Sequence, residues 1–272
     1  MDLQILRDTP PWDWPRDAGK RFQETLTDRR ASESDRLVAA ELAGDLTVIN
    51  DDLAAYLAAI VSSPGEPDRL RATAAIALGP ILELADTEGF GDPDDVPITQ
   101  RTFRNIQDVL RTLYADNTTP KEVRRRILEA SVRAPESWHP SAIGAAYSSG
   151  DKDWMLTAVF SMRWVQGFDD RILDALKSGD PQTRYEAVKA AGNWGLAAAW
   201  EPIVAIVQEA DAPKPLLLAA IGAVADIRPG EARTILGDLA VAGDEEVAEA
   251  AAEAIGMAEA EADLEGGEEW LN

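Results

Sequence analysis

Few residues of this 272-residue sequence have the types and spacing that enzyme chemistry requires. Cysteine is absent, which excludes thiol nucleophiles, disulfide frameworks and zinc–cysteine sites. The one histidine, His139, lies between Trp138 and Pro140 at a predicted helix start, where we expect a surface or capping role. Phosphate-binding glycine loops, nucleophile elbows and helical histidine pairs do not occur. We therefore predict no catalytic residue and a protein that is not an enzyme.

The acidic segment Asp92-Pro93-Asp94-Asp95 is a candidate cation site, because Ca²⁺ prefers carboxylate and carbonyl oxygens as ligands. Counting from Asp92, however, the sixth residue is Pro97 rather than Gly and the twelfth is Phe103 rather than Glu. This spacing does not fit an EF-hand loop. We interpret the segment as a solvated acidic loop and predict neither a metal site nor a cofactor.

The basic run Arg124-Arg125-Arg126 is the other charged feature that could bind a ligand. We expect Arg124 to pair with an acid of a neighbouring repeat, and the other two to be solvated beside Glu122 and Glu129. The whole chain has 49 acidic and 26 basic residues and a formal net charge of -23, which repels a phosphate backbone. The sequence therefore excludes nucleic acid as the partner and favours a protein or peptide, with a basic segment among the candidates.

Tryptophan is the residue type most typical of a binding surface in this sequence. Trp164 and Trp194 are 30 residues apart, and Trp138 and Trp200 fall near them. A row of indoles along one edge would form an aromatic ladder for a peptide or another apolar ligand, because Trp supplies a large rigid contact area. The alternative is that these side chains fill the core between repeats.

The elements that position these side chains are helices that recur along the chain. An apolar residue or Thr starts each pattern, a small residue follows four positions later, and in three copies a Gly follows nine positions later. The equivalent positions are Leu37, Leu70, Val123, Trp154, Thr183, Leu216 and Val247. Their separations are 33, 53, 31, 29, 33 and 31 residues, so a period near 31 recurs with one insertion.

A second helix follows each first helix, and its apolar residues are four positions apart. The pairs are Ile143 with Tyr147, Ile172 with Leu176, Ile203 with Val207, and Ile235 with Leu239. This spacing places both side chains on one helix face. One such hairpin cannot cover its own apolar face, but stacked hairpins form a continuous core. The sequence thus predicts an all-α fold, an α-solenoid of about six or seven helical hairpins.

Helix caps and composition indicate the boundaries. Asp180-Pro181 has the pattern of an N-cap followed by proline, and Thr119-Pro120-Lys121-Glu122 that of a capping box. Residues 1–33 are predicted to form an N-terminal extension with a capping helix, in which Ala18, Phe22 and Leu26 share a face. Residues 34–260 form the repeat array, with an acidic loop inserted at about 86–97. Residues 261–272 are acidic and predicted to be disordered.

The motif Asp180-Pro181-Gln182-Thr183-Arg184, with Ala187, Ala190 and Gly192, resembles HEAT repeats, in particular those of the short, phycobilin-lyase-like subtype. Its consensus reads roughly D-P-x-V-R-x-x-A-x-x-A-L-G. The last copy matches at Val247, Ala251, Ala254, Ile255 and Gly256, and Leu70-Arg71 and Val123-Arg124 match the apolar–Arg pair. The resemblance covers about residues 35–260, although 151–163 and 213–226 lack the Arg. It implies a solenoid whose second helices line the concave face.

A protein with this fold and no catalytic constellation is expected to be a non-enzymatic scaffold or adaptor for a partner protein or peptide. The candidate binding residues are Trp138, Trp164, Trp194, Trp200, Arg171, Asp174, Glu201 and Asp238. The alternative, which the resemblance implies, is a lyase- or chaperone-like enzyme acting on a bound chromophore or modified group. The missing cysteine argues against that alternative, and the acidic charge contradicts a helical-repeat DNA glycosylase.

Neither the start of the sequence nor its apolar runs indicate a membrane or export signal. The first residues, with Asp2, Asp8 and Pro10-Pro11, lack the basic and apolar regions of a signal peptide. No uninterrupted apolar run reaches the roughly 18 residues that cross a bilayer. We expect a cytoplasmic protein without membrane contact, whose oligomeric state the sequence does not indicate.

Overall fold

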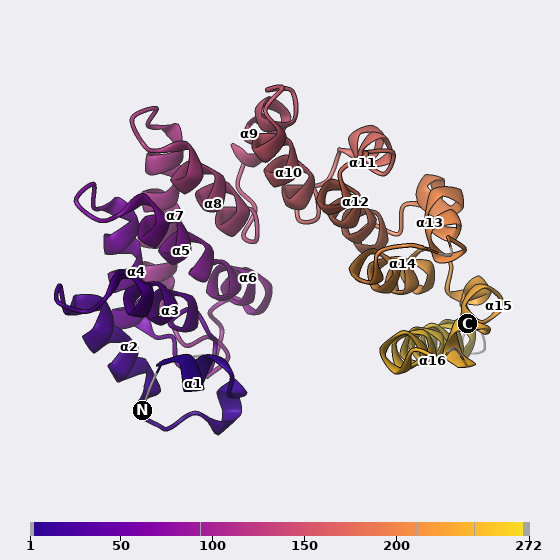
Figure 1. Cartoon of the computed structure of the whole chain (residues 1–272), viewed down its shortest axis with the longest axis horizontal. Helices are drawn as coiled ribbons and strands as arrows, with labels where there is room; N and C mark the ends of the chain where they lie inside the picture. Colours follow the sequence, from indigo (N-terminus) through magenta and orange to yellow (C-terminus); the bar gives the residue numbers. More distant parts are fainter. Residues whose placement is uncertain (1–2, 93, 210, 242, 269–272) are drawn as a thin grey trace. The chain divides into compact units, whose positions relative to one another are not determined.

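The computed structural model describes residues 3–92, 94–209, 211–241 and 243–268, with only the backbone described for 261–268. In these ranges the regular elements are all helices, as Figure 1 shows, and no β-strand occurs. The chain divides into two compact units, Met1–Ala142 and Ile143–Asn272. The predicted all-α fold of stacked helical hairpins is confirmed within each unit.

The first unit is built on first helices of three repeats that pack side by side, α3, α5 and α8. The second helices α4 and α7 pack against them and against each other. In chain order the elements are α1 (Leu3–Arg7), the 3₁₀ helix η1 (Pro11–Asp13), α2 (Ala18–Thr27), α3 (Glu33–Leu42), α4 (Asp51–Ser62), α5 (Asp68–Ala77), α6 (Gly79–Glu88), α7 (Gln100–Ala115), α8 (Lys121–Ser131) and α9 (His139–Tyr147), which continues into the second unit.

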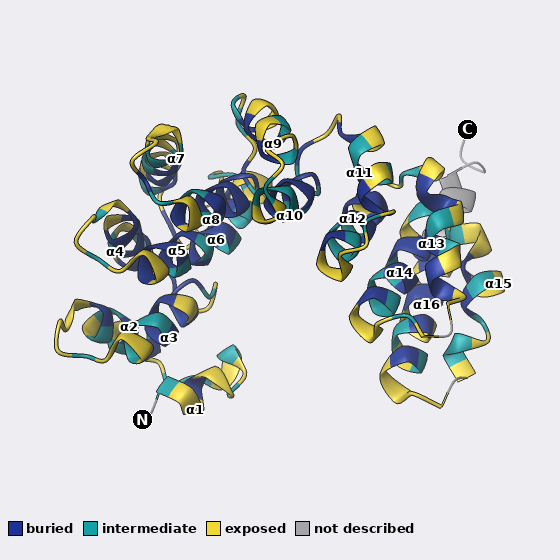
Figure 2. Ribbon diagram, turned by 45° about the horizontal axis from the view of Figure 1, so that its top comes forward, coloured by how far each residue is buried: buried dark blue, intermediate teal, exposed yellow. Residues whose placement is uncertain are grey.

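The second unit repeats this arrangement, because α10, α12, α14 and α16 pack in succession and α11, α13 and α15 accompany them. Its elements after α9 are α10 (Lys152–Ser161), α11 (Asp169–Ala175), α12 (Pro181–Asn193), η2 (Ala197–Ala199), α13 (Trp200–Val207), α14 (Lys214–Ile227), η3 (Pro229–Glu231), α15 (Ala232–Leu236), η4 (Leu239–Val241) and α16 (Glu245–Glu268). Figure 2 shows the buried residues gathered where neighbouring helices of a unit meet. All seven positions predicted to be equivalent lie in first helices.

Helix α2 packs against the first helix of the first repeat. Ala18, Phe22 and Leu26 are fully buried in it, and α2 packs against α3. The short helices before it were not predicted. Leu6 of α1 is fully buried in the same core, and the indole nitrogen of Trp14 donates to the carbonyls of Leu6 (2.8 Å) and Thr9 (2.9 Å). The N-terminal segment is therefore folded onto the first unit.

The insertion in the second repeat is a helix followed by a loop. Helix α6 extends from Gly79 to Glu88, and the acidic loop lies between Glu88 and the start of α7 at Gln100. The loop, predicted at about 86–97, begins after Glu88, since Asp86 belongs to the last turn of α6. Glu83 of α6 pairs with Arg133 at 2.8 Å, which fixes the inserted helix against the end of α8.

One of the two predicted N-caps forms. The Asp180 carboxylate accepts from the Thr183 N–H (2.8 Å) and hydroxyl (2.7 Å), and these bonds lower the pKa of Asp180. The capping box at Thr119 was wrong, because Pro120 takes the N-cap position of α8 and no side chain caps that helix. At the other end of the chain, α16 continues to Glu268, past residue 261 where we predicted disorder, while residues 269–272 lie outside the described residues.

Arginines of the first helices join successive repeats. Each donates to a carbonyl ten residues earlier, in the last turn of the preceding helix, where carbonyls lack a partner inside that helix. The three bonds run from Arg36 to Leu26 (3.1 Å), from Arg71 to Val61 (2.9 Å) and from Arg124 to Tyr114 (2.9 Å). These arginines therefore link the first helices α3, α5 and α8 to the end of the helix that precedes each of them.

The motif glycine allows a close approach between first helices. A Cβ atom added to Gly192 of α12 would lie 3.0 Å from the Ala223 Cβ and from an Asp226 carboxylate oxygen, both on α14. Its equivalent Gly256, on α16, has nothing within 4 Å of an added Cβ. The same motif position is therefore sterically required in one repeat and open in another.

The basic run on α8 differs from expectation at Arg125. Arg126 is partly exposed and pairs with Glu122 (3.3 Å) and Glu129 (2.5 Å). Arg125 is only 6% exposed, so the prediction that it is solvated was wrong, and it pairs with Glu122 at 3.2 Å. The apolar surroundings of α8 bury both Arg125 and Glu129, and such buried charges require ionic partners. These pairs give the run a structural role.

Candidate partner-binding groove

The four tryptophans predicted to bind a partner are half-buried or buried in the structure. Trp138, in the first unit, lies half-buried against Tyr114 (ring centroids 5.0 Å apart), and its indole N–H donates to Glu136 at 2.9 Å. In the second unit Trp200 is only 5% exposed, and the Arg228 guanidinium covers its ring at 4.8 Å. Both side chains are engaged inside their own unit.

Trp164 and Trp194 occupy equivalent turns after α10 and α12, as predicted from their spacing. The Trp194 indole N–H donates to the Met162 carbonyl at 2.7 Å, so it closes the end of α10. The Trp164 ring lies against Phe160, with centroids 4.8 Å apart, and Arg163 covers it. Both rings are half-buried. The Trp194 indole therefore links two neighbouring repeats, whereas the contacts of Trp164 lie within its own repeat.

Two of the predicted charged residues meet on the second helices. Asp174 of α11 accepts from the Tyr147 hydroxyl of α9 at 2.7 Å, and Arg171 lies over the Tyr147 and Phe168 rings at 5.4 Å. Burial and the bond to Asp174 raise the pKa of Tyr147 to about 12, so the phenol stays neutral. Glu201 of α13 and Asp238, which follows α15, are exposed and do not join this cluster.

His139 is fully buried, so the expectation of a surface position was wrong, while its capping role is right. Its Nδ1 accepts from the Glu136 N–H at 2.8 Å, just before α9 begins. The ring proton is therefore on Nε2, which lies 3.0 Å from the Ser131 hydroxyl. Burial lowers the pKa of His139 from 6.5 to about 4. The imidazole is a neutral structural group.

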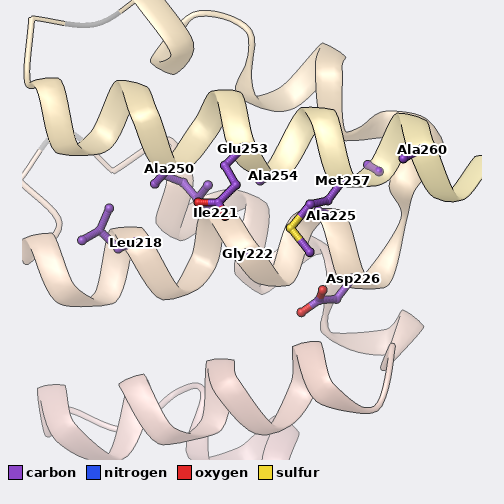
Figure 3. Close-up of a pocket in the computed structure, with 11 residues that line it drawn as sticks. Leu218, Ile221, Gly222, Ala225, Asp226, Ala250, Glu253, Ala254, Met257 and Ala260 are labelled. Carbon is purple, nitrogen blue, oxygen red and sulfur yellow. The ribbon is translucent and has the colours of Figure 1, made fainter. Parts of the chain in front are cut away.

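A groove of about 560 Å³ lies between α14 and α16 in the second unit. This volume is in the range of ligand-binding clefts. On α14 its wall is formed by Leu218, Ile221, Gly222, Ala225 and Asp226. On α16 it is formed chiefly by Ala250, Glu253, Ala254 and Met257. Figure 3 shows Glu253 and Met257 extending from α16 toward α14, with Asp226 near the end of α14.

Small side chains create the groove. Gly222 leaves open space on α14, since nothing lies within 4 Å of a Cβ built on it. Ala225 and Ala250 add only methyl groups to the walls. Met257 is 66% exposed at the mouth, and its flexible thioether can adapt to different apolar surfaces. The groove can therefore accept an apolar side chain from outside.

Carboxylates define the charge of the groove. Asp226 and Glu253 are the ionisable side chains that line it, and both are acidic. The unit around it carries 24 acidic but only 9 basic residues over Ile143–Asn272. An apolar floor with an acidic rim complements a segment that combines apolar and basic side chains.

None of the predicted binding residues lines this groove, and sequence reasoning missed it. The small residues on α14 and α16 are the signal in the sequence, but the same residue types also allow tight packing, as at Gly192. No cluster of three or more acidic or histidine side chains that could hold a metal occurs among the described residues. Of the helices described, none combines the length and the apolar composition needed to cross a bilayer.

Comparisons with known proteins concern the fold. No family model and no curated protein matches the chain. The X-ray structure of YibA from E. coli, a HEAT-like repeat protein, is similar over 90% of this chain and 87% of its own, with 15% sequence identity and a TM-score of 0.50. An engineered protein is matched over 90% of this chain and 98% of its own, with 17% identity and a TM-score of 0.37. The chain thus has an all-helical fold that resembles HEAT-like repeats.

Proposed function

We propose that this protein is a non-enzymatic scaffold that binds a partner protein through a segment of mixed apolar and basic character, seated in the α14–α16 groove. The observation that carries the proposal is the groove itself, with its open space at Gly222 and its acidic rim at Glu253 and Asp226. HEAT-like repeats typically serve as binding scaffolds, which supports the same function.

A groove-filling substitution tests this function. The probe is a fluorescein-labelled, alanine-based helical peptide with leucines four residues apart and an arginine after each, which we call the Leu–Arg peptide. Gly222→Leu places a side chain in the open space of the groove and should weaken binding of the peptide at least about tenfold, a loss of about 1.4 kcal/mol. Fluorescence polarisation measures the affinity.

Gly256→Leu is the matched control, because it adds the same side chain to α16 at a position with nothing within 4 Å. It should leave peptide binding unchanged, and circular dichroism should show equal helix content for both variants. If the wild type does not bind the Leu–Arg peptide, or if both variants bind it as the wild type does, the groove is not the partner site.

A further inference from the structure

The first unit contains a groove at the same repeat positions, and there the chain's own N-terminal segment forms one wall. That groove, of about 440 Å³, lies between α3 and α5. Four residues that line it are three, six, seven and ten positions after Leu70. They are Thr73, Ile76 and Ala77 of α5 and Pro80 at the start of α6.

The α16 wall of the second-unit groove uses the same four positions, counted from the equivalent Val247. They are Ala250, Glu253, Ala254 and Met257. One wall of each groove therefore uses the same four positions of the repeat. The two grooves differ in the number of their walls. The α14–α16 groove is lined by residues of those two helices, whereas the groove of the first unit has a third wall, formed by Arg7, Thr9, Pro11 and Trp14.

The N-terminal segment shows which chemistry such a groove accepts. Leu6 of α1 is fully buried in the core, and the adjacent Arg7 pairs with Glu41 of α3 at 3.4 Å. Trp14 packs edge-on against Phe22, with ring centroids 5.4 Å apart. The short helix α1 therefore packs on α3 beside this groove. Its leucine is buried in the core, and the arginine that follows directly lines the groove and meets a carboxylate of α3.

We infer that the partner segment bound at the α14–α16 groove is a short helix of the same kind, with a buried leucine-like residue and an arginine or lysine that pairs with Glu253. The inference rests on the proposed function and specifies its ligand. Glu253 supplies the carboxylate on the groove wall, where α5 has the apolar Ile76 at the equivalent position. The acidic excess of the second unit favours the same charge in the partner.

A charge-swap experiment tests the pairing. Glu253→Lys should weaken the Leu–Arg peptide at least about tenfold and should strengthen a Leu–Glu peptide, in which glutamates replace the arginines, by a similar factor. Glu249→Lys is the control, because it changes the net charge equally at an exposed position of α16 outside the groove lining. It should change the affinity of each peptide less than threefold.

The outcomes separate the inference from the function on which it rests. If Gly222→Leu abolishes peptide binding while Glu253→Lys and Glu249→Lys change the peptide affinities by the same factor, the groove is the binding site and the proposed pairing with Glu253 is wrong. If a proline placed in the middle of the Leu–Arg peptide leaves its affinity unchanged, the bound segment is not helical and the inference fails. If no peptide binds the wild type, both the function and the inference fail.

Discussion

The protonation of His139 depends on its burial. Its Nδ1 already accepts the Glu136 N–H, so a second ring proton would break that bond and place a charge in the core. This explains why the pKa of His139 lies near 4 in the folded protein. The unfolded chain, in contrast, binds that proton below about 6.5.

A falling pH should therefore destabilise the protein through His139. The stabilisation is complete above about pH 6.5 and is lost as the pH falls toward 4, because only the unfolded state binds the proton in this window. Between pH 7 and pH 5 the loss should be about 2 kcal/mol. Urea unfolding at both pH values measures it, and His139→Gln should show a smaller pH dependence. Equal pH dependence in the two proteins would contradict the assignment.

Two helical glycines should respond to alanine with opposite signs. Gly222→Ala should stabilise the protein by about 1 kcal/mol, because alanine favours helix and the Cβ meets open space. Gly192→Ala should destabilise it by about 1 kcal/mol, because the overpacking against Ala223 and Asp226 exceeds the gain in helix propensity. Thermal unfolding of both variants measures the difference. A stabilised Gly192→Ala protein would show that α12 and α14 separate easily.

At the scale of elements, an arginine that donates to a carbonyl at the end of the preceding helix should contribute more to the free energy of unfolding than a surface arginine does. Arg71 is buried and donates to the Val61 carbonyl, so Arg71→Ala leaves that carbonyl without this donor and should cost about 2 kcal/mol. Arg69→Ala, at an exposed neighbouring position on α5, should change stability by less than about 0.5 kcal/mol. Urea unfolding compares the two. Similar losses would mean that the bond to Val61 contributes little.

The spacing of apolar residues was sufficient to predict the repeating helices. Positions from Leu37 to Val247 recur because each first helix must bury the same stripe against its neighbours. Helix α6 was not predicted, because the acidic and Gly-rich composition after Asp86 indicated only a loop in the insertion. Ile81 and Leu82 are nevertheless buried residues of that helix. The capping box failed because Pro120, whose side chain cannot accept a hydrogen bond, takes the N-cap position before Lys121.

The groove could not be predicted in the same way. A groove depends on side chains that are absent, and the small residues that leave room at Gly222 have the same periodicity as those that allow tight packing at Gly192. Whether two helices close over a small residue or remain apart depends on packing in three dimensions. The tryptophans, in contrast, suggested a binding surface by their residue type. In the structure an indole N–H can instead bond within the fold, as that of Trp194 does to the Met162 carbonyl.

For the molecule as a whole, the charge imbalance should make stability depend on salt. The formal net charge is -23, and unscreened carboxylates repel one another in the compact state. Raising NaCl from about 0.01 M to about 1 M shortens the Debye length from about 30 Å to about 3 Å. We expect the melting temperature to rise by several degrees, since about 1 kcal/mol corresponds to roughly 2–4 °C at this chain length.

A variant with fewer acids provides the comparison for the salt series. Glu245→Gln combined with Glu249→Gln removes two exposed carboxylates of α16. Its melting temperature should rise less with salt than that of the wild type. A wild-type melting temperature that stays constant or falls with salt would show that the ion pairs of the fold outweigh the repulsion.

The vacant space beside Gly256 makes this chain a natural starting point for protein design. On α12, the glycine at this motif position allows α14 to pack closely against it. The equivalent glycine of α16 leaves room for an additional hairpin to pack in the same way. An engineered module with an alanine facing Gly256, as Ala223 faces Gly192, would need no remodelling of the existing backbone. The addition of a further repeat would then use the space for one methyl group beside Gly256.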